Sequence, residues 1–218
     1  MRRTTKFAAM AATGAMGLFL LGNVPGPVSH AQAPAAAVVT APLTGTWTID
    51  PAHTNVTFGI RHLGISTVRG RFNDVSGTIV ADAARPEKSS VKVTIKTASV
   101  DTGIEMRDNH LRTADFLDAE KYPEITFEST RIVRRGRGFV AHGKFTLHGV
   151  TRDIALPFEV KGPVNDGMGS SRIGAETQIK LNRRDYGINY GTALANGALD
   201  VGNDVDVNIS LEAVPAKG

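Results

Sequence analysis

The sequence predicts a mostly β protein in which antiparallel strands form a closed barrel or a sandwich. Most of the chain alternates apolar and polar residues with a period of two, and Gly, Pro, Asn and Asp separate the alternating segments. A single stretch, around residues 103–120, has helical spacing instead. We therefore expect about eight to ten strands with one short helical insertion, and a closed barrel would leave none of their edges exposed.

The N-terminus has the pattern of a secretory signal peptide. Arg2, Arg3 and Lys6 come first, an apolar stretch follows at 7–21, and small residues come after it. At about 15 residues, this stretch is shorter than the roughly 20 that a membrane-spanning helix needs. We expect residues 1–31 to be a signal peptide and the mature protein to be exported.

The rest of the chain divides into a linker and one domain. Cleavage is expected after Ala31 or Ala33, and Ala31 is preferred because Pro34 would otherwise follow the cut. Residues 32–44 are rich in Ala and Pro without periodicity, which is typical of a flexible linker. Residues 45–214 are expected to form a single folded domain.

Charge and cysteine content exclude several function classes. The chain has 25 Lys and Arg against 21 Asp and Glu, but three of the basic residues lie in the leader, so the mature domain is nearly neutral. Nucleic-acid binding needs clustered basic residues and is not expected. The basic run at 134–138 fits a solvated hairpin turn, with a contact to anionic lipid headgroups as the alternative. The absence of cysteine excludes disulfides, thiolate metal sites and a cysteine nucleophile.

The first two alternating segments establish the strand pattern. One strand is expected at 46–49, and after a turn Val56, Phe58 and Ile60 share one face of the next strand. His62 lies on the same face by parity. Further alternating segments predict strands at 68–72, 75–81, 91–95, 125–132, 139–147, 154–160, 173–181 and 205–211.

The helical insertion begins with a capping signal. Thr102 and Glu105 stand three positions apart before apolar residues, the pattern of a capping box, so a helix should begin near Gly103. Thr113 can cap a second short turn. The apolar stripe that should cover the barrel contains Ile104, Leu111 and Ala114, and the charged residues that should face water are Arg107, Asp108 and Arg112.

Four segments, in this order along the chain, resemble the YceI-like, polyisoprenoid-binding family. They are 49–72, which begins IDPAHTNVTFGI, then 99–130, which contains MRDNHLRTADFLDAEKYPEITF, then 143–160, and finally NRRDYGINY at 182–190. The resemblance implies a lipocalin-like, closed antiparallel barrel of about eight strands, exported to the bacterial periplasm. It also implies an interior that holds a long isoprenoid chain, such as a quinone tail or a polyprenyl lipid.

Transferred residue by residue, the resemblance implies a set of ligand-binding positions. Strand residues that should face the interior are Val56, Phe58, Ile60, Phe72, Val93, Ile95, Phe127, Phe145, Leu147, Leu156 and Phe158. Helix residues that should close or line the interior are Ile104, Met106, Leu111 and Phe116. Our candidates for contact with a polar headgroup are His62, Arg107 and Tyr190.

The histidines do not predict a metal site. His53, His62 and His110 lie on separate elements, and no short-range ligand spacing supports a shared ion. His142 and His148 fall on positions that should point to water. We predict no metal, no cofactor and no catalytic residue.

The family resemblance alone favours a non-enzymatic carrier for a lipophilic molecule, since composition by itself indicates only an exported antiparallel β domain. One alternative is an enzyme that acts on an amphiphilic substrate with His62 or the region of Asp115. Another is a protein-interaction module with a solidly packed core and a partner at the loop 182–203. Alternation does not separate a cavity from a packed core, because both are apolar. A homodimer and a transient contact with a membrane surface are left open.

Overall fold

Strands make up most of residues 43–217, the part of the chain that this computed structural model describes. The predicted signal peptide, 1–31, and the predicted linker up to residue 42 lie outside the described residues. The strands are β1 (Thr44–Ile49), β2 (Asn55–His62), β3 (Ser66–Phe72), β4 (Val75–Asp82), β5 (Ser90–Lys96), β6 (Val100–Asp101), β7 (Glu124–Arg135), β8 (Gly138–Leu147), β9 (Val150–Asn165), β10 (Ser171–Asn182) and β11 (Val201–Pro215). The helices are α1 (Glu105–Arg112) and the 3₁₀ turns η1 (Pro86–Lys88), η2 (Thr97–Ser99) and η3 (Arg183–Tyr186).

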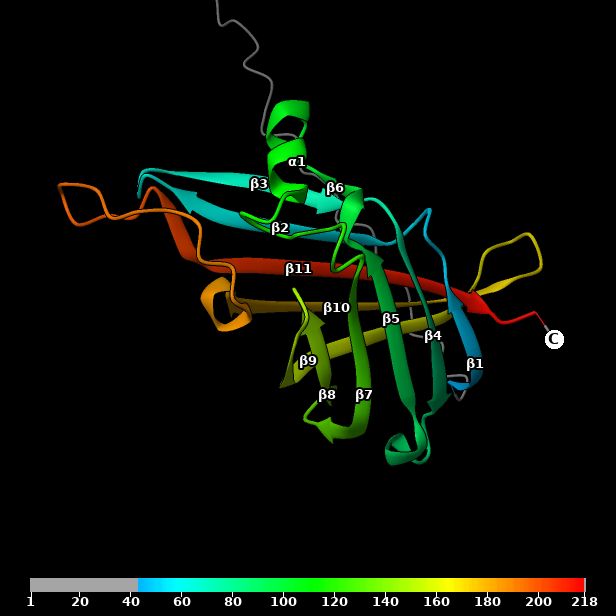
Figure 1. The fold of residues 1–218 in the computed structure, drawn as a ribbon. Helices are drawn as coiled ribbons and strands as arrows, with labels where there is room; N and C mark the ends of the chain where they lie inside the picture. The colour runs from blue at the N-terminus through cyan, green and yellow to red at the C-terminus, as the bar shows by residue number, and fades with distance from the viewer. Residues whose placement is uncertain (1–42, 218) are drawn as a thin grey trace, which may run out of the picture. The chain divides into compact units, whose positions relative to one another are not determined.

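Eight of these strands close into an antiparallel barrel (Figure 1). Their order is β1, β4, β5, β7, β8, β9, β10 and β11, and β11 pairs back with β1. In the closing contact, Trp47 lies opposite Pro215 and Ile49 lies opposite Ala213. The predicted antiparallel barrel with one short helical insertion is therefore confirmed, and the sandwich alternative is wrong because β1 and β11, the first and last of these eight strands, pair with each other.

The sheet branches at β11. One edge of β11 pairs with β1 only at its last residues, and along Val201 to Ser210 the same edge pairs with β2. Strands β3 and β6 continue from β2, so a second group of strands lies beside the closed barrel (Figure 1). Because β6 leads directly into α1, this branch places the helix next to β3 and above the interior.

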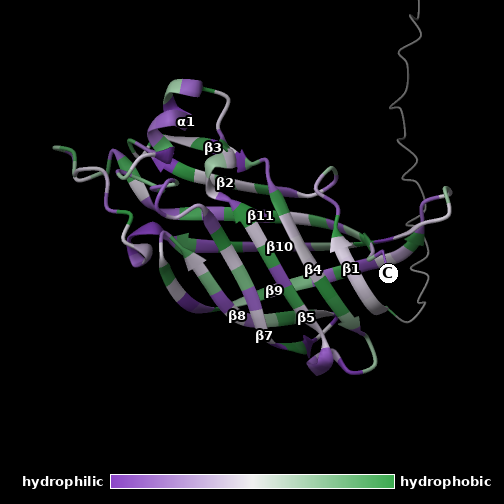
Figure 2. Cartoon of the chain, turned by 45° about the vertical axis from the view of Figure 1, so that its right-hand side comes forward, coloured by the Kyte–Doolittle hydropathy of each residue, from purple (hydrophilic) through white to green (hydrophobic). Residues whose placement is uncertain are grey.

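The period of two decides which side chains form the core. Strands coloured by hydropathy show apolar and polar residues in alternation (Figure 2), and the apolar ones face the interior. One buried cluster contains Val56, Val75, Ile95 and Ile125, and a second contains Phe127, Ile132, Ala141 and Leu156. Burial of each Val, Ile, Leu or Phe in these clusters stabilises the fold by about 1.5–3 kcal/mol relative to its exposed state. The core of the barrel therefore follows from the sequence pattern.

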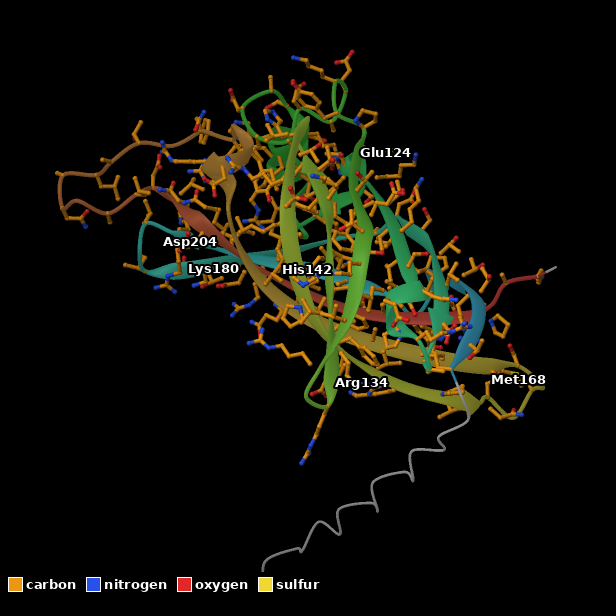
Figure 3. All side chains as sticks on the ribbon, turned by 90° about the horizontal axis from the view of Figure 1, so that it is seen from below. Glu124, Arg134, His142, Met168, Lys180 and Asp204 are labelled. Carbon is orange, nitrogen blue, oxygen red and sulfur yellow. The ribbon has the colours of Figure 1, made fainter. Side chains whose placement is uncertain are left out.

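Polar side chains of the same strands point outward (Figure 3). Lys96 on β5 and Glu124 on β7 form an ion pair across the outer surface, with 2.6 Å between Nζ and Oε1. Exposed pairs of this kind contribute only about 0–1 kcal/mol. The outer surface therefore adds little stability compared with the apolar interior. None of the helices within residues 43–217 is long and apolar enough to span a membrane.

Helix α1 departs from its prediction at its start. Ile104 is the N-cap residue, and no side chain caps the helix. Thr102 instead donates its backbone N–H and its hydroxyl to Asp108 Oδ1, at 2.9 and 2.5 Å. The predicted capping box is wrong because the Thr102 hydroxyl, which would have capped a backbone N–H at the start of the helix, is hydrogen-bonded to Asp108 instead. After Thr113 the chain continues in a short turn, and the Asp115 N–H donates to Thr113 Oγ1 at 3.4 Å, as the predicted cap requires.

The buried side of α1 includes charged residues that were predicted to face water, and of the predicted apolar stripe only Leu111 lines the cavity. Asp108 is 6% exposed, whereas Met106 is 81% exposed and Ile104 is also exposed. Arg112 donates Nε to Ala98 O at 2.8 Å and Nη2 to Val100 O at 2.9 Å. The helix thus lies against backbone carbonyls around β6, and these need hydrogen-bond donors that apolar residues cannot supply.

Candidate ligand-binding cavity

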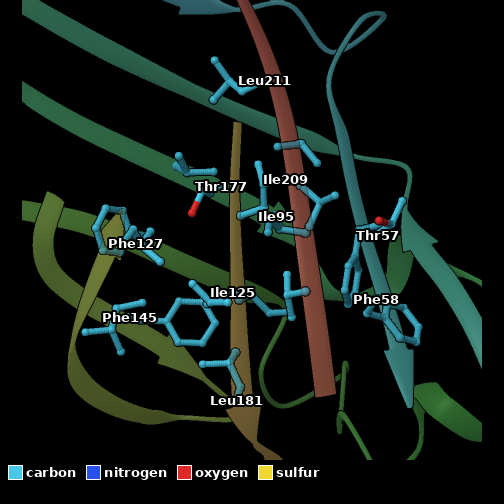
Figure 4. Close-up of a pocket in the computed structure, with 18 of the residues that line it drawn as sticks. Thr57, Phe58, Ile95, Ile125, Phe127, Phe145, Thr177, Leu181, Ile209 and Leu211 are labelled. Atoms are coloured by element: carbon cyan, nitrogen blue, oxygen red, sulfur yellow. The ribbon is translucent and has the colours of Figure 1, made fainter. Parts of the chain in front are cut away.

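The barrel encloses a cavity of about 490 Å³ (Figure 4). This volume lies within the roughly 300–1,000 Å³ that is typical of small-molecule sites. Most of the lining is aliphatic or aromatic, and the side chains shown in Figure 4 include Phe58, Ile95, Ile125, Phe127, Phe145, Leu181, Ile209 and Leu211. The interior is therefore hollow, which the sequence pattern alone did not decide.

Two glycines make room for aromatic rings in the wall. A Cβ on Gly70 of β3 would lie 2.5 Å from Cζ of Phe58, and a Cβ on Gly143 of β8 would lie 2.7 Å from the Phe127 ring. A larger residue at either position would clash with these rings, and at Gly143 also with the Glu128 carbonyl oxygen. Phe58 also packs against Phe72, with 5.7 Å between the ring centroids. The small residues thus determine where the aromatic lining lies.

A cluster of rings lies at the end of the cavity that α1 covers. The ring centroids of Phe116 and Tyr190 are 4.5 Å apart, and the His110 ring makes an edge contact with each of them at 5.1 Å. His110 Nε2 is 2.9 Å from Asp115 Oδ2, which fixes the ring plane. All three rings line the cavity, and Tyr190 is also exposed to solvent. This end of the cavity therefore combines apolar ring faces with polar edges.

Arg107 brings a positive charge to the same end. Its Nε donates to Thr102 Oγ1 at 2.7 Å, and its Nη2 donates to the Thr102 carbonyl at 2.9 Å. Its Nη1 makes no hydrogen bond within residues 43–217, and the side chain contributes to the cavity lining. Arg107 can therefore donate to a polar group of a ligand without giving up its own anchor.

Arg183 is a lining residue that the sequence analysis missed. It is 3% exposed and donates Nε to Gly202 O at 2.7 Å, Nη1 to Ile188 O at 2.8 Å and Nη2 to Val201 O at 3.0 Å. Burial lowers the pKa of its guanidinium. These three bonds hold the segment with Tyr190 against β11. The N-R-R-D-Y motif marked the region, but nothing in it showed which arginine turns inward.

Most of the predicted binding positions line the cavity. The residues that do so are Val56, Phe58, Ile60, His62, Phe72, Val93, Ile95, Arg107, Leu111, Phe116, Phe127, Phe145, Leu147, Leu156, Phe158 and Tyr190. Ile104 and Met106 do not, and their assignment to the lining is wrong. Both side chains are exposed because α1 turns Asp108 and Leu111 inward and leaves Ile104 and Met106 on its solvent side. Ligand binding by the lining residues stays a prediction.

His148 does not point to water as expected. Its Nδ1 is 3.1 Å from the carbonyl oxygen of Tyr186, and its ring packs on Tyr122 with 4.7 Å between centroids. The residue has a positive φ of 51°, so it lies in a turn where strand parity no longer applies. Its contacts connect the end of β8 to η3.

The described residues contain one group with the spacing of metal ligands, Asp50, His53 and Glu212. Arg172 bridges its carboxylates, with Nη1 2.7 Å from Asp50 Oδ2 and 2.5 Å from Glu212 Oε1. The hydrogen bond from Arg172 lowers the pKa of Asp50 to about 2. A guanidinium thus already supplies the positive charge that these carboxylates need, so the group forms a structural ion-pair network on the outside of the barrel.

Comparison with known proteins gives consistent matches. The YceI-like domain family matches residues 47–213. A UPF0312 protein of Serratia proteamaculans is 41% identical over 165 residues, covering 76% of this chain and 83% of that protein. The crystal structure of a Campylobacter jejuni YCEI protein has a TM-score of 0.60 at 34% identity and covers 72% of this chain and 90% of its own.

A more distant structural neighbour has the same fold. It is a polyisoprenoid binding domain from Saccharophagus degradans implicated in plant cell wall breakdown, with a TM-score of 0.57. Its sequence is 17% identical, and the match covers 78% of this chain and 98% of that domain. At this identity the likeness concerns the fold alone. Taken with the family match over most of the domain and the identity to named relatives, it leads to one conclusion: the chain belongs to the YceI-like family.

Proposed function

We propose that this protein is a periplasmic binding or carrier protein that holds a polyisoprenoid, or a similar long-chain amphiphile, inside the barrel. The observation that carries the proposal is the cavity of about 490 Å³, whose lining is almost entirely apolar. A hydrocarbon chain needs no hydrogen-bond partner, and such an interior offers few. The expected cargo is therefore a molecule with a long apolar tail and one polar end.

The energetics of burial suit such a cargo. Each methylene group moved from water into an apolar interior gains about 0.8 kcal/mol, so ten of them gain roughly 8 kcal/mol before the cost of association. Binding of this kind is strong but tolerant of tail structure. The cavity would then select ligands by the length and shape of their tails, and polar contacts would set the orientation of the bound ligand.

The polar end would lie at the α1 end of the cavity. The free Nη1 of Arg107 supports this, together with His62 and Tyr190, which also line the cavity. Each of the three side chains can donate a hydrogen bond to a carbonyl, hydroxyl or phosphate oxygen. The cargo would thus enter with its tail first and keep its headgroup near α1.

The comparisons support the same class of cargo. A neighbour with this fold is described as a polyisoprenoid binding domain, and the barrel of this chain contains an apolar cavity. The secretory pattern at 1–31 supports a periplasmic location. We extend the binding role to this chain as a proposal, with quinones, polyprenyl lipids and fatty-acid derivatives as the main candidates.

The two other hypotheses are less well supported. A packed-core interaction module requires a filled interior, and the cavity argues against one. For an enzyme, the Asp115 carboxylate would need to approach a bound substrate, but it is exposed and paired with His110. Binding without turnover is therefore the simpler proposal.

Extraction of the protein with organic solvent, followed by mass spectrometry, tests the proposal. The protein is purified from the periplasm, both directly and after incubation with a membrane extract. We expect one isoprenoid or other long-chain molecule per protein molecule. If nothing is extracted in either case, and no farnesol or long-chain fluorescent probe binds to the purified protein, the carrier function is wrong.

A further inference from the structure

An apolar tip lies beside the α1 end of the cavity. It consists of the β2–β3 turn, residues 63–65, and the segment 191–200 that precedes β11. Leu63 donates its backbone N–H to Asp200 O at 2.8 Å, and a Cβ on Gly64 would lie 3.4 Å from Ala198 Cβ. Both parts of the tip lie at the left-hand end of Figure 1, next to each other. They therefore form one surface, although they are far apart in the sequence.

The tip is apolar on the outside. Ile65 is 79% exposed, Leu63 is partly exposed, and the segment GTALANGAL at 191–199 has no charged residue. The carboxylate of Asp200 is used internally, because its Oδ1 accepts the backbone N–H of Thr192 at 2.8 Å and of Val201 at 2.7 Å. The exposed side chains of the tip are therefore uncharged and mostly apolar, and exposed apolar groups rimmed by polar residues mark sites of contact with proteins or membranes.

The tip adjoins the opening of the cavity. His62 precedes the turn, Tyr190 precedes the segment and Val201 follows it, and all three line the cavity. Tyr190 has its ring against Phe116 and is exposed on its other side. An aromatic residue with a polar tip is well suited to the boundary between water and hydrocarbon. Whatever covers the tip would thus be in contact with the entrance of the cavity.

Two arginines lie beside the tip. Arg61 donates Nη2 to Gly64 O at 2.9 Å and Nη1 to Thr67 Oγ1 at 3.2 Å. Arg69 is exposed on the neighbouring strand, opposite Gly59. Within residues 43–217 neither of them forms an ion pair, so no acidic side chain offsets either charge directly. An apolar surface with a basic border matches the boundary of a bilayer that contains anionic lipids.

We propose that this tip inserts into the surface of an anionic phospholipid bilayer and brings the cavity entrance to the membrane. The inference goes beyond the proposed cargo, because docking depends on the tip and not on what the cavity holds. A second copy of the chain is the competing occupant. The two uncompensated arginines disfavour it, since two identical tips would bring four positive charges together.

Flotation with vesicles tests the proposal. Full-length mature protein is mixed with vesicles of phosphatidylethanolamine and phosphatidylglycerol, or of phosphatidylcholine alone. We expect the protein to float with the anionic vesicles and Ile65→Asp to bind them at least about tenfold more weakly, because a charge would have to enter the interface. Arg69→Gln should weaken binding to anionic vesicles only.

Met168→Asp is the matched control. Met168 is 86% exposed, but it lies on the β9–β10 turn at the other end of the molecule (Figure 3). Its substitution should leave vesicle binding unchanged. The proposal is overturned if the wild-type protein does not bind anionic vesicles, or if Ile65→Asp and Met168→Asp weaken binding equally. It is also overturned if the wild-type protein is a dimer that Ile65→Asp dissociates into monomers without changing vesicle binding.

The test separates docking from cargo binding. Ile65 does not line the cavity, so Ile65→Asp should bind a farnesol probe with wild-type affinity. Its melting temperature should also match the wild type, since the side chain is exposed. If Ile65→Asp no longer floats with vesicles but still binds the probe, the result supports membrane docking by the tip. If the wild-type protein does not bind the probe, the result counts against the proposed function alone.

Discussion

The barrel wall and helix α1 use the same residue types in opposite ways. In the wall, Ile125 and Phe127 of β7 are buried, and Glu124 and Glu128 on the same strand are exposed. In α1, Met106 is exposed while Asp108 is buried. A strand in a closed sheet is hydrogen-bonded to a neighbour on each edge and cannot rotate. The alternation of its residues therefore decides which side chains face the interior. A helix of eight residues is free to rotate until its contacts are best satisfied, and here those contacts are backbone carbonyls and Thr102.

Placing a charge on the inner face of the wall should have the largest effect. Phe58 lines the cavity and packs against Phe72. We expect Phe58→Asp to lower the affinity for a long-chain probe by at least about a hundredfold, because an unpaired carboxylate in an apolar site costs several kcal/mol. Fluorescence titration of the folded variant measures this.

Phe58→Leu is the control for that substitution and should retain affinity to within about tenfold, since it keeps an apolar side chain of similar reach. Phe58→Ser replaces the charged variant if circular dichroism shows that Phe58→Asp does not fold. Unchanged affinity in a folded Phe58→Asp would contradict the assignment of this face to the ligand.

Removing the buried carboxylate of α1 should have the next largest effect. Asp108→Ala leaves the N–H and the hydroxyl of Thr102 without their acceptor. We expect the free energy of unfolding to fall by about 1–3 kcal/mol, measured by urea denaturation. Asp108→Asn keeps an acceptor oxygen, so its free energy of unfolding should fall by less than that of Asp108→Ala. An Asp108→Ala variant as stable as the wild type would mean that α1 is held by its apolar residues after all.

Acid should weaken the outer surface of the wall by a smaller amount. Arg172 lowers the pKa of Asp50 from 3.8 to about 2, so the folded state is stabilised at pH above 3.8 and loses this contribution as the pH falls towards 2. The loss is at most about 2.5 kcal/mol, and solvent screening reduces it. Urea denaturation at several pH values should show a shallower decline between pH 4 and 2 for Asp50→Asn.

The matched control for the acid experiment is Asp153→Asn. Asp153 forms an exposed ion pair with Lys144 on the outside of the barrel. Its substitution should leave the acid decline as steep as in the wild type. Equal slopes for the Asp50 and Asp153 variants would show that the Arg172 network is not what makes folding sensitive to acid.

Substitution of the exposed apolar residue of α1 should have the smallest effect. Met106→Gln should change the free energy of unfolding by no more than about 0.5 kcal/mol and leave probe binding unchanged. Leu111→Gln is the comparison, because Leu111 lies on the same helix and lines the cavity. Met106→Gln would contradict the structure if it weakened binding as much as Leu111→Gln does.

Much of the wall could be predicted from the sequence because its information is local. Val56, Phe58 and Ile60 occupy alternate positions, and any antiparallel sheet with one apolar face places them together. For the same reason most of the predicted lining is found on the cavity. The family resemblance supplied the barrel as the arrangement of these strands, and the insertion was recognised by its different spacing.

What the sequence by itself determined, then, is the set of strands, their apolar faces and the place of the insertion. Only the tertiary structure decided that the interior is hollow, that β11 pairs with both β1 and β2, that Asp108 and not Met106 is buried, and that Arg183 turns inward. The physical reason is that strand alternation is fixed by neighbouring residues. Closure of the barrel, rotation of a short helix and burial of an arginine depend instead on hydrogen-bond partners that lie far away in the sequence.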